Sequence, residues 1–168
     1  MSTDTITAIG ACFIALLALL LGIWEAREAR QHARLSVIPK LMFDTTVSSA
    51  WPEVGIKLLN KGVGPALIDE FRLLVDGKRV ESNSAEDFGG WRDAVVLLGI
   101  DEDWIRYYCL DTADAVGAGE SIMLFGIAPG RQNADTLRKF ETALPHIQIV
   151  VRYRSFYDDR FTVSLRPR

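Results

Sequence analysis

The chain has 168 residues, which is enough for one folded domain and a membrane anchor but not for two domains. Its 49% hydrophobic and 24% charged residues are ordinary proportions for a globular protein, and its formal net charge is −3. Residues 35–168 hold sixteen Lys and Arg against nineteen Asp and Glu, so we expect no nucleic-acid partner.

The chain begins with an apolar run in which no charged side chain occurs between Thr5 and Trp24. At a rise of about 1.5 Å per residue, this run reaches roughly 30 Å, the thickness of a bilayer core. Its large apolar side chains favour insertion by roughly 3 to 6 kcal/mol in total. A domain of this size could not enclose a helix that is apolar on every face. We therefore predict a short tail at 1–4 and a transmembrane helix at 5–24 that contacts the lipid bilayer.

Three other interpretations of the apolar run fit the sequence poorly. A cleaved signal peptide needs a basic segment before the run and a small-x-small site after it, but Asp4 precedes this run and 24–27 reads Trp-Glu-Ala-Arg. A lipoprotein needs its cysteine after the run, whereas Cys12 precedes most of it. A helix lying on the membrane surface needs a polar face, which is absent here. The sequence therefore favours a permanent anchor.

The residues that follow the anchor predict its orientation. Residues 25–34 are strong helix formers and are expected to continue the helix as a charged stalk. No Lys or Arg precedes the anchor, whereas Arg27, Arg30, Arg34 and Lys40 follow it. Because basic residues are retained on the cytoplasmic side, we expect a single-pass protein of the cell inner membrane with its C-terminal domain in the cytoplasm. The stalk arginines either contact anionic headgroups or only set the topology, and we favour the second interpretation.

Residues 35–168 are dominated by the alternation of apolar and polar side chains, which predicts β-strands. Asp76–Gly77, Gly117–Gly119 and Asp158–Asp159 are the expected turns. Seven or eight short strands of this kind are typical of an antiparallel, immunoglobulin-like β-sandwich, so the fold class is expected to be mainly β. The expected strands lie at 35–41, 54–58, 71–75, 79–80, 104–110, 122–127, 147–153 and 161–165.

Two segments instead carry apolar residues at spacings of three and four and predict short accessory helices. The first is expected to end at Gly99, and the second to begin after Asn133 and to stop at Pro145. Their apolar faces are formed by Phe88, Trp91, Val95 and Leu98 in the first helix, and by Leu137, Phe140 and Leu144 in the second.

The most distinctive motif is Asn60-x-Gly62-x-Gly64-Pro65-Ala66. It predicts a strand that ends at Asn60, a turn on two glycines that adopt positive φ, and an asparagine side chain bonded to nearby backbone. It is not a phosphate-binding Walker loop, because no Lys-Ser/Thr pair follows and the next element is a strand.

Taken with the membrane helix before it, this motif resembles a group of uncharacterised bacterial proteins. These have a single membrane helix and a small β domain carrying an Asn-x-Gly-x-Gly-Pro-Ala turn. The resemblance covers nearly the whole chain and implies location and fold, but it implies no activity. The other segments that carry it are Arg34–Leu41, Val75-Asp-Gly-Lys78, Gly119-Glu120 and Tyr153-Arg-Ser-Phe-Tyr157.

Catalytic and metal-binding groups are scarce. The two histidines, His32 and His146, lie near no Gly-x-Ser-x-Gly nucleophile elbow, and two cysteines and two distant histidines are too few ligands for zinc. Cys109 is expected to be a small buried hydrophobe, and no disulfide is expected within the folded domain. We therefore expect no enzyme, no cofactor, no metal and no catalytic residue. An enzyme would require His146, Cys109 or the Asp101 cluster to converge in one cleft.

Charged clusters are interpreted as solvated surface. The cluster Asp101–Asp103 matches no calcium-binding loop and is expected in a loop after the first helix. Arginines are concentrated near the C-terminus. They could form a basic face towards acidic lipid or a partner, or they could pair across strands with acids such as Asp158 and Asp159. We favour the pairing with acids. These arginines are Arg152, Arg154, Arg160, Arg166 and Arg168.

We expect a membrane-tethered, non-catalytic interaction or scaffold module at the inner membrane face, with a protein partner of unknown identity. The alternative is a ligand-sensing domain with an aromatic-lined pocket between helix and sheet. The side chains expected to line that pocket are Trp91, Trp104, Tyr107 and Tyr108.

Overall fold

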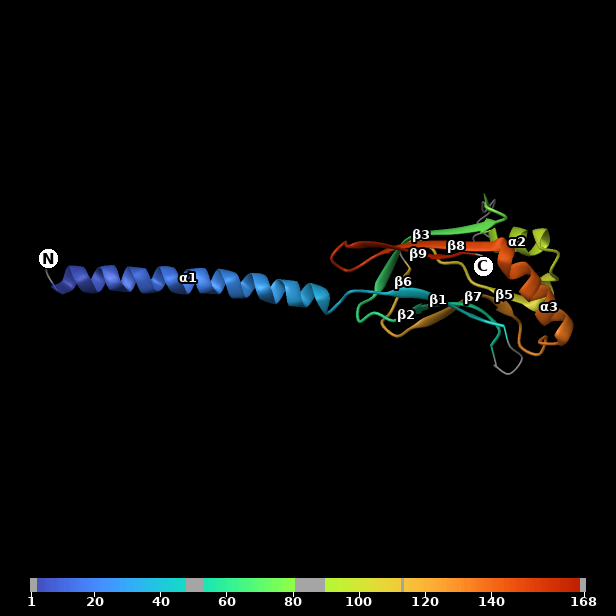
Figure 1. Ribbon diagram of the computed structural model, residues 1–168, viewed down its shortest axis with the longest axis horizontal. Coiled ribbons are helices and arrows are strands. Elements are labelled where there is room, and N and C mark those ends of the chain that lie inside the picture. The colour runs from blue at the N-terminus through green and yellow to red at the C-terminus, as the bar shows by residue number, and fades with distance from the viewer. Residues whose placement is uncertain (1–2, 48–52, 81–89, 113, 167–168) are drawn as a thin grey trace. The chain divides into compact units, whose positions relative to one another are not determined.

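The computed structural model of the chain describes residues 3–47, 53–80, 90–112 and 114–166, in two compact units, Met1–Ser36 and Val37–Arg168. The first unit is one helix, α1 (Thr3–Leu35), drawn in blue in Figure 1. The helix runs through residues 25–34 without a break, so these residues are helical, and their role as a stalk stays a prediction.

The middle of α1 is apolar on every side. The segment Gly10–Leu35 is long and apolar enough to cross a membrane, and none of it is buried in the protein. The large apolar side chains of this segment lie exposed, which is the arrangement expected of a helix in contact with lipid rather than with a protein core. These exposed side chains are Phe13, Ile14, Leu16, Leu17, Leu19, Leu20, Leu21, Ile23 and Trp24.

The second unit contains two sheets in which all described strand pairs are antiparallel (Figure 1). The two sheets and the two helices predicted from apolar spacing are confirmed, whereas the immunoglobulin-like sandwich stays a prediction. The first sheet has the order β1 (Leu41–Thr46), β2 (Gly55–Asn60), β7 (Ser121–Ile127), β5 (Ile105–Tyr107). The second has the order β4 (Lys78–Arg79), β3 (Ala66–Val75), β8 (Ile147–Arg154), β9 (Arg160–Leu165), with β6 (Ala115–Val116) also paired to β3.

Both sheets contribute to one buried core, which the helices α2 (Trp91–Leu97) and α3 (Ala134–Ala143) also enter. Figure 1 shows α2 and α3 at the same end of the two sheets. A stack of three rings joins them: Trp91 lies 4.8 Å from Phe125 of β7, and Phe125 lies 5.4 Å from Phe140 of α3, between ring centroids. This aromatic stack connects both helices to the first sheet.

Most element boundaries agree with the sequence pattern. Asn133 caps α3 by accepting a hydrogen bond from the Thr136 N–H at 2.9 Å, as predicted. Gly99 follows α2 with a positive φ of 66°, which suits its predicted place at the helix end. Pro145 lies in η3 (Leu144–His146), a 3-10 helix of one turn that ends the second predicted helix. Phe88, predicted for the first helix, lies outside the described residues.

Two strand predictions need correction, and one short strand was not predicted. The strand predicted at 35–41 is wrong, because α1 continues to Leu35 and β1 begins only at Leu41. The strand predicted at 104–110 is shorter, since Trp104 belongs to the 3-10 helix η2 (Glu102–Trp104) and β5 ends at Tyr107. The two-residue strand β6 was not predicted, because so short a segment shows no alternation.

Candidate functional site

The Asn60 side chain is the centre of a buried hydrogen-bond cluster. Its Oδ1 accepts from the backbone N–H of Lys40 at 3.1 Å and of Gly62 at 2.9 Å. Its Nδ2 donates to the carbonyls of Gly64 at 2.8 Å and Val116 at 2.9 Å. All four hydrogen bonds available to a primary amide in this geometry are therefore made, and they join three separate segments of the domain. The prediction that Asn60 ends a strand and bonds to backbone is confirmed.

The role predicted for the two glycines of the motif is wrong. Neither Gly62 nor Gly64 has a positive φ. They are required instead for close approach, because a Cβ at Gly64 would overlap the carbonyl group of Val37, and a Cβ at Gly62 would overlap the backbone of Ile38–Lys40. The motif thus holds the segment Val37–Lys40, the first residues of the domain, against the loop that follows β2.

The residues considered for catalysis lie in different surroundings. His146 Nδ1 lies 2.5 Å from Oδ1 of Asp76, in the turn between β3 and β4, and both side chains are exposed. Cys109 lies after β5 and is half-buried, where burial, followed by the charges of Asp111 and Asp114, raises the pKa of its thiol to about 11. A thiol with so high a pKa is protonated at neutral pH and is a poor nucleophile.

The acidic cluster serves local structure. Asp101 caps η2 by accepting from the Asp103 N–H at 3.2 Å, and Glu102 accepts from the Tyr107 hydroxyl at 3.1 Å. Among the described residues, no three His, Cys, Asp or Glu side chains gather where they could hold a metal ion.

The four aromatic residues considered for a ligand pocket do not share one. Trp91 is fully buried in the core, and its indole N–H donates to the Tyr108 carbonyl at 3.1 Å. The Trp104 ring lies 4.5 Å beneath the Lys139 ammonium, and Tyr108 is exposed. Of the four, Tyr107 lines the pocket described next.

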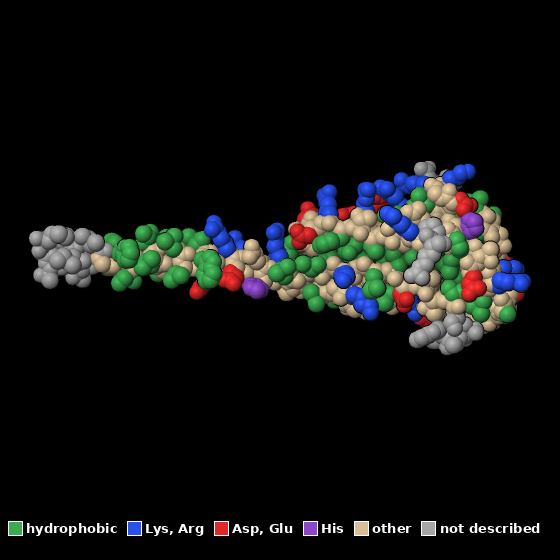
Figure 2. Space-filling model, in the orientation of Figure 1, with side chains coloured by type: hydrophobic (Ala, Val, Ile, Leu, Met, Phe, Trp, Pro, Cys, Tyr) green, Lys and Arg blue, Asp and Glu red, His purple; other side chains and the backbone are tan. Residues whose placement is uncertain are grey.

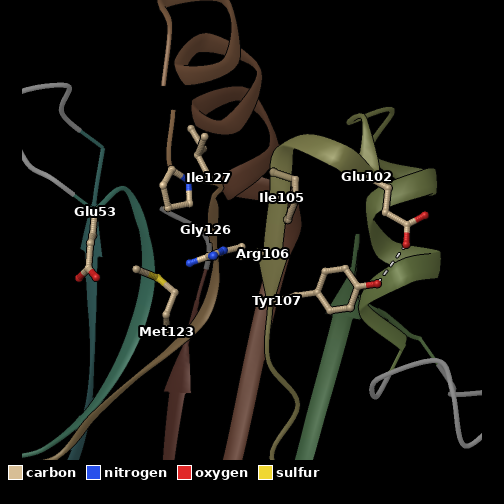
Figure 3. A pocket seen from close by; sticks show the side chains of 9 residues that line it. Glu53, Glu102, Ile105, Arg106, Tyr107, Met123, Gly126 and Ile127 are labelled. Atoms are coloured by element: carbon tan, nitrogen blue, oxygen red, sulfur yellow. Dashed lines mark hydrogen bonds between the residues drawn. The ribbon is translucent and has the colours of Figure 1, made fainter. Parts of the chain in front are cut away.

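A pocket of about 550 Å³ lies over the first sheet, and we call it the β5–β7 pocket (Figure 3). A β-bulge lies beside it: Ile56 pairs with Phe125 but the next residue pairs with Met123, so Leu124 is the extra residue. Leu124 and Phe125 are both buried as a result. The floor includes Gly126, where a Cβ would lie 2.7 Å from the Val54 carbonyl oxygen and 2.9 Å from the Met123 sulfur.

Charged groups line the β5–β7 pocket. In Figure 3, Glu53 and Glu102 lie at opposite ends, with Met123 and Arg106 between them. Each glutamate already has a basic partner: Glu53 bonds to Lys57, which lowers the pKa of Glu53, and Glu102 lies 3.4 Å from Arg92. Arg106 pairs with no described acid, so it is the cation of this pocket that remains open to a ligand.

A second candidate surface is the outer face of the second sheet. Antiparallel register places Arg152 opposite Glu70 and Thr162, Arg154 opposite Arg160, and Arg72 opposite Val150. Because directly paired residues point to the same face, these side chains all share the outer face. Arg79 joins them because it lies opposite Leu74, two residues from Arg72, and Arg166 is exposed directly after β9. We call the following set the arginine face: Arg72, Arg79, Arg152, Arg154, Arg160 and Arg166.

Three acids pair with part of the arginine face. Arg152 lies 3.1 Å from Glu70, which also bonds to Arg72, and Arg154 lies 3.1 Å from Asp69 and 2.9 Å from Asp158. The predicted pairing of these arginines with acids is thus confirmed, but Asp158 contacts Arg154 from the turn that follows β8, and the acid that pairs across strands is Glu70. Asp159 instead accepts a hydrogen bond from the Ser155 hydroxyl at 3.1 Å. Arg160 and Arg166 pair with no acid in the described part of the chain, and Arg168 lies outside it.

The β5–β7 pocket was missed by sequence reasoning. A signal for it exists in Gly126, because a glycine inside a strand often marks a bulge or a close backbone approach. No protein-family model, no curated protein and no solved structure matches the chain.

Proposed function

We propose that this chain is a single-pass protein of a bacterial inner membrane whose β domain is a non-catalytic interaction or scaffold module. The observation that carries the proposal is the exposure of large apolar side chains all round α1. Exposing an apolar surface of this length to water is energetically unfavourable, whereas a bilayer would cover it. The anchor is the segment 5–24, with 25–34 as a stalk above the bilayer.

The domain faces the cytoplasm in this proposal. The support is the asymmetry of basic residues, with Arg27, Arg30, Arg34 and Lys40 after the span and none before it. A reporter that fluoresces only in the cytoplasm, fused after Arg168, is expected to be bright in membrane fractions. A dark fusion that is still inserted in the membrane would contradict this orientation.

The two sheets form an immunoglobulin-like sandwich in this proposal. Its support is that buried side chains of both sheets belong to one core, as when two sheets pack face to face. Such domains commonly serve as binding modules, because rigid sheets present side chains without needing catalytic groups.

The interaction role is tested by affinity purification of the tagged full chain from mild detergent. We expect reproducible recovery of at least one protein that does not accompany a matched bait consisting of residues 1–36 alone. That control removes partners of the membrane helix. If the two baits recover the same proteins, the scaffold role of the β domain is refuted.

Ligand sensing is the second candidate function, and the observation that favours it is Arg106 in the β5–β7 pocket. A pocket of about 550 Å³ has the size of a small-molecule site, and an arginine without a described acidic partner suits a carboxylate ligand. We expect small carboxylates, but not the matching amides, to raise the unfolding temperature of the chain. Arg106→Met should abolish this shift and Arg131→Met should preserve it, so an equal loss in both variants would count against the pocket.

A further inference from the structure

The arginine face carries more positive charge than its own acids balance. Its six arginines stand against Asp69, Glu70 and Asp158, which leaves three unbalanced positive charges in a chain whose net charge is −3. Figure 2 shows Lys and Arg side chains gathered over the side of the domain that carries β3 and β8. This face is therefore opposite in sign to the chain as a whole.

One pair on this face is unfavourable for folding. Arg154 and Arg160 occupy directly opposite positions on β8 and β9. Like charges at such positions destabilise a sheet, and either acidic or neutral residues would serve the hairpin better. Asp69 and Asp158 offset only the charge of Arg154. A sequence that breaks a local rule without a structural gain commonly does so at a functional surface.

The composition of this face favours a charged surface over a folded protein as its partner. Binding to proteins usually depends on a few Trp, Tyr and Arg side chains that are fully desolvated in pockets at the centre of the interface. Phe161 stacks on Tyr153 with 5.4 Å between ring centroids, and Phe156 and Tyr157 are exposed in the turn between β8 and β9. The described residues directly opposite these arginines include Leu67 and Leu74 as well as Glu70, Val150 and Thr162. The side chains of Arg152 and Arg154 are 54% and 44% exposed, so they present their charge to solvent.

We propose that the arginine face binds the headgroups of anionic lipids. This inference rests on the proposed membrane anchor, because a tether keeps the domain at high effective concentration near a bilayer. The arginines are spread over β3, β8, β9 and the adjoining β4, with Arg166 directly after β9, and β9 itself extends for roughly 17 Å from Arg160 at about 3.4 Å per residue. A set of cations spread across a sheet matches a layer of many headgroups better than one anion in a cleft.

The test distinguishes a failure of the membrane anchor from a failure of the arginine face. The full chain is reconstituted into nanodiscs of zwitterionic lipid and then mixed with heavy vesicles that sediment. We expect capture by vesicles with about 30% phosphatidylserine, no capture by phosphatidylcholine vesicles, and loss of capture between about 50 mM and about 500 mM salt. If the chain does not enter the nanodiscs, the anchor fails; if it enters but anionic vesicles do not capture it, only the arginine face fails.

Two single substitutions make the same charge change at different places. Arg160→Glu should weaken vesicle capture by about tenfold or more, since basic residues near an anionic surface each contribute strongly to binding. Arg131→Glu, in the exposed connection between β7 and α3, should leave capture within about twofold. Equal losses in both variants would show a dependence on net charge alone and would overturn the proposal.

Stability distinguishes a lipid-binding role from a structural one. Because Arg160 faces Arg154, Arg160→Glu replaces a repulsive pair by an attractive one and should keep or slightly raise the unfolding temperature. Lower capture together with a clearly lower unfolding temperature would mean that Arg160 serves the fold, which contradicts the inference. Soluble polyglutamate tests the alternative that the arginine face binds an acidic polypeptide. If polyglutamate binds the chain and anionic vesicles do not, the lipid proposal is overturned in favour of that alternative.

Discussion

At the residue scale, Asn60 shows how one polar side chain organises a domain. It is 1% exposed, and its amide joins residues 40, 62, 64 and 116. A buried polar group is favourable only when its hydrogen bonds are made, and here each bond also satisfies a backbone group. The side chain therefore replaces a section of sheet ladder.

We expect Asn60→Ala to lower the free energy of unfolding by about 3 kcal/mol, because it leaves two N–H groups and two carbonyls without their partner. Asn133→Ala is the matched control: it removes only the cap of α3 and should cost about 1 kcal/mol. Denaturant unfolding of the two variants measures the difference. Equal losses would mean that water replaces the Asn60 bonds.

Cys109 illustrates how burial and charge set the reactivity of a thiol. Its pKa rises from 9.0 to about 11, so near pH 8 its thiolate is scarcer by about 100-fold, and alkylation should slow in proportion. The measurement is iodoacetamide labelling of a Cys12→Ser variant, native and then denatured. The folded state holds this proton more tightly, so folding stability should also fall as pH rises from 9.0 towards about 11. Equal labelling rates in the two states would contradict this environment.

At the element scale, the segment Val37–Lys40 is held by backbone hydrogen bonds to the loop after β2, and its Pro39 is also buried. The N–H of Lys61 donates to the Lys40 carbonyl at 2.8 Å, and the N–H of Val63 donates to the Ile38 carbonyl at 3.2 Å. This backbone contact requires glycine opposite the segment, because a side chain would occupy the same space. The Asn-x-Gly-x-Gly-Pro-Ala motif is thus a docking site for the first residues of the domain.

Gly64→Ala should destabilise the domain by about 3 kcal/mol or more, since its Cβ would overlap Val37 and force the segment away. Gly117→Ala is the control, because the nearest atom to its Cβ is the flexible carboxylate of Glu120 at 3.2 Å. Thermal unfolding compares the two variants. If the two variants have the same unfolding temperature, the close approach at Gly64 does not contribute to the stability of the domain.

At the scale of the whole molecule, the anchor and the domain obey different rules. The domain buries its apolar residues in one core, whereas α1 exposes them, and in the proposed function lipid covers them. Orientation then depends on charges that lie outside the apolar run. This separation makes orientation testable without disturbing the fold.

We expect the orientation to reverse when the flanking charges are exchanged. Replacing Arg27, Arg30 and Arg34 by Gln and placing lysines at Ser2 and Thr3 moves the basic excess to the other flank. The reporter at Arg168 should then lose its cytoplasmic fluorescence while the chain stays in the membrane. A reporter that stays bright would show that the folded domain, not the flanking charge, sets the orientation.

Patterns that depend on neighbouring residues were predicted well. The apolar run predicted a membrane-competent helix, the alternation predicted strands at 54–58, 122–127, 147–153 and 161–165, and Asn133 and Pro145 marked the ends of the second helix. These features follow from hydrophobic periodicity and capping, which act over a few residues. The first strand was misplaced because residues 36–40 alternate like a strand but bond to the loop after β2 instead.

The tertiary structure decided everything that depends on distant residues meeting. The apolar run, its flanking arginines and the arginine-rich C-terminus can be found in the sequence alone, since they depend on composition and spacing. The glycine contact with Val37, the bulge beside the β5–β7 pocket and the pairing of Glu70 with Arg152 cannot, because each joins segments far apart in the chain. Strand register, which no local pattern specifies, determines which charges on the arginine face are balanced and which stay open to a partner.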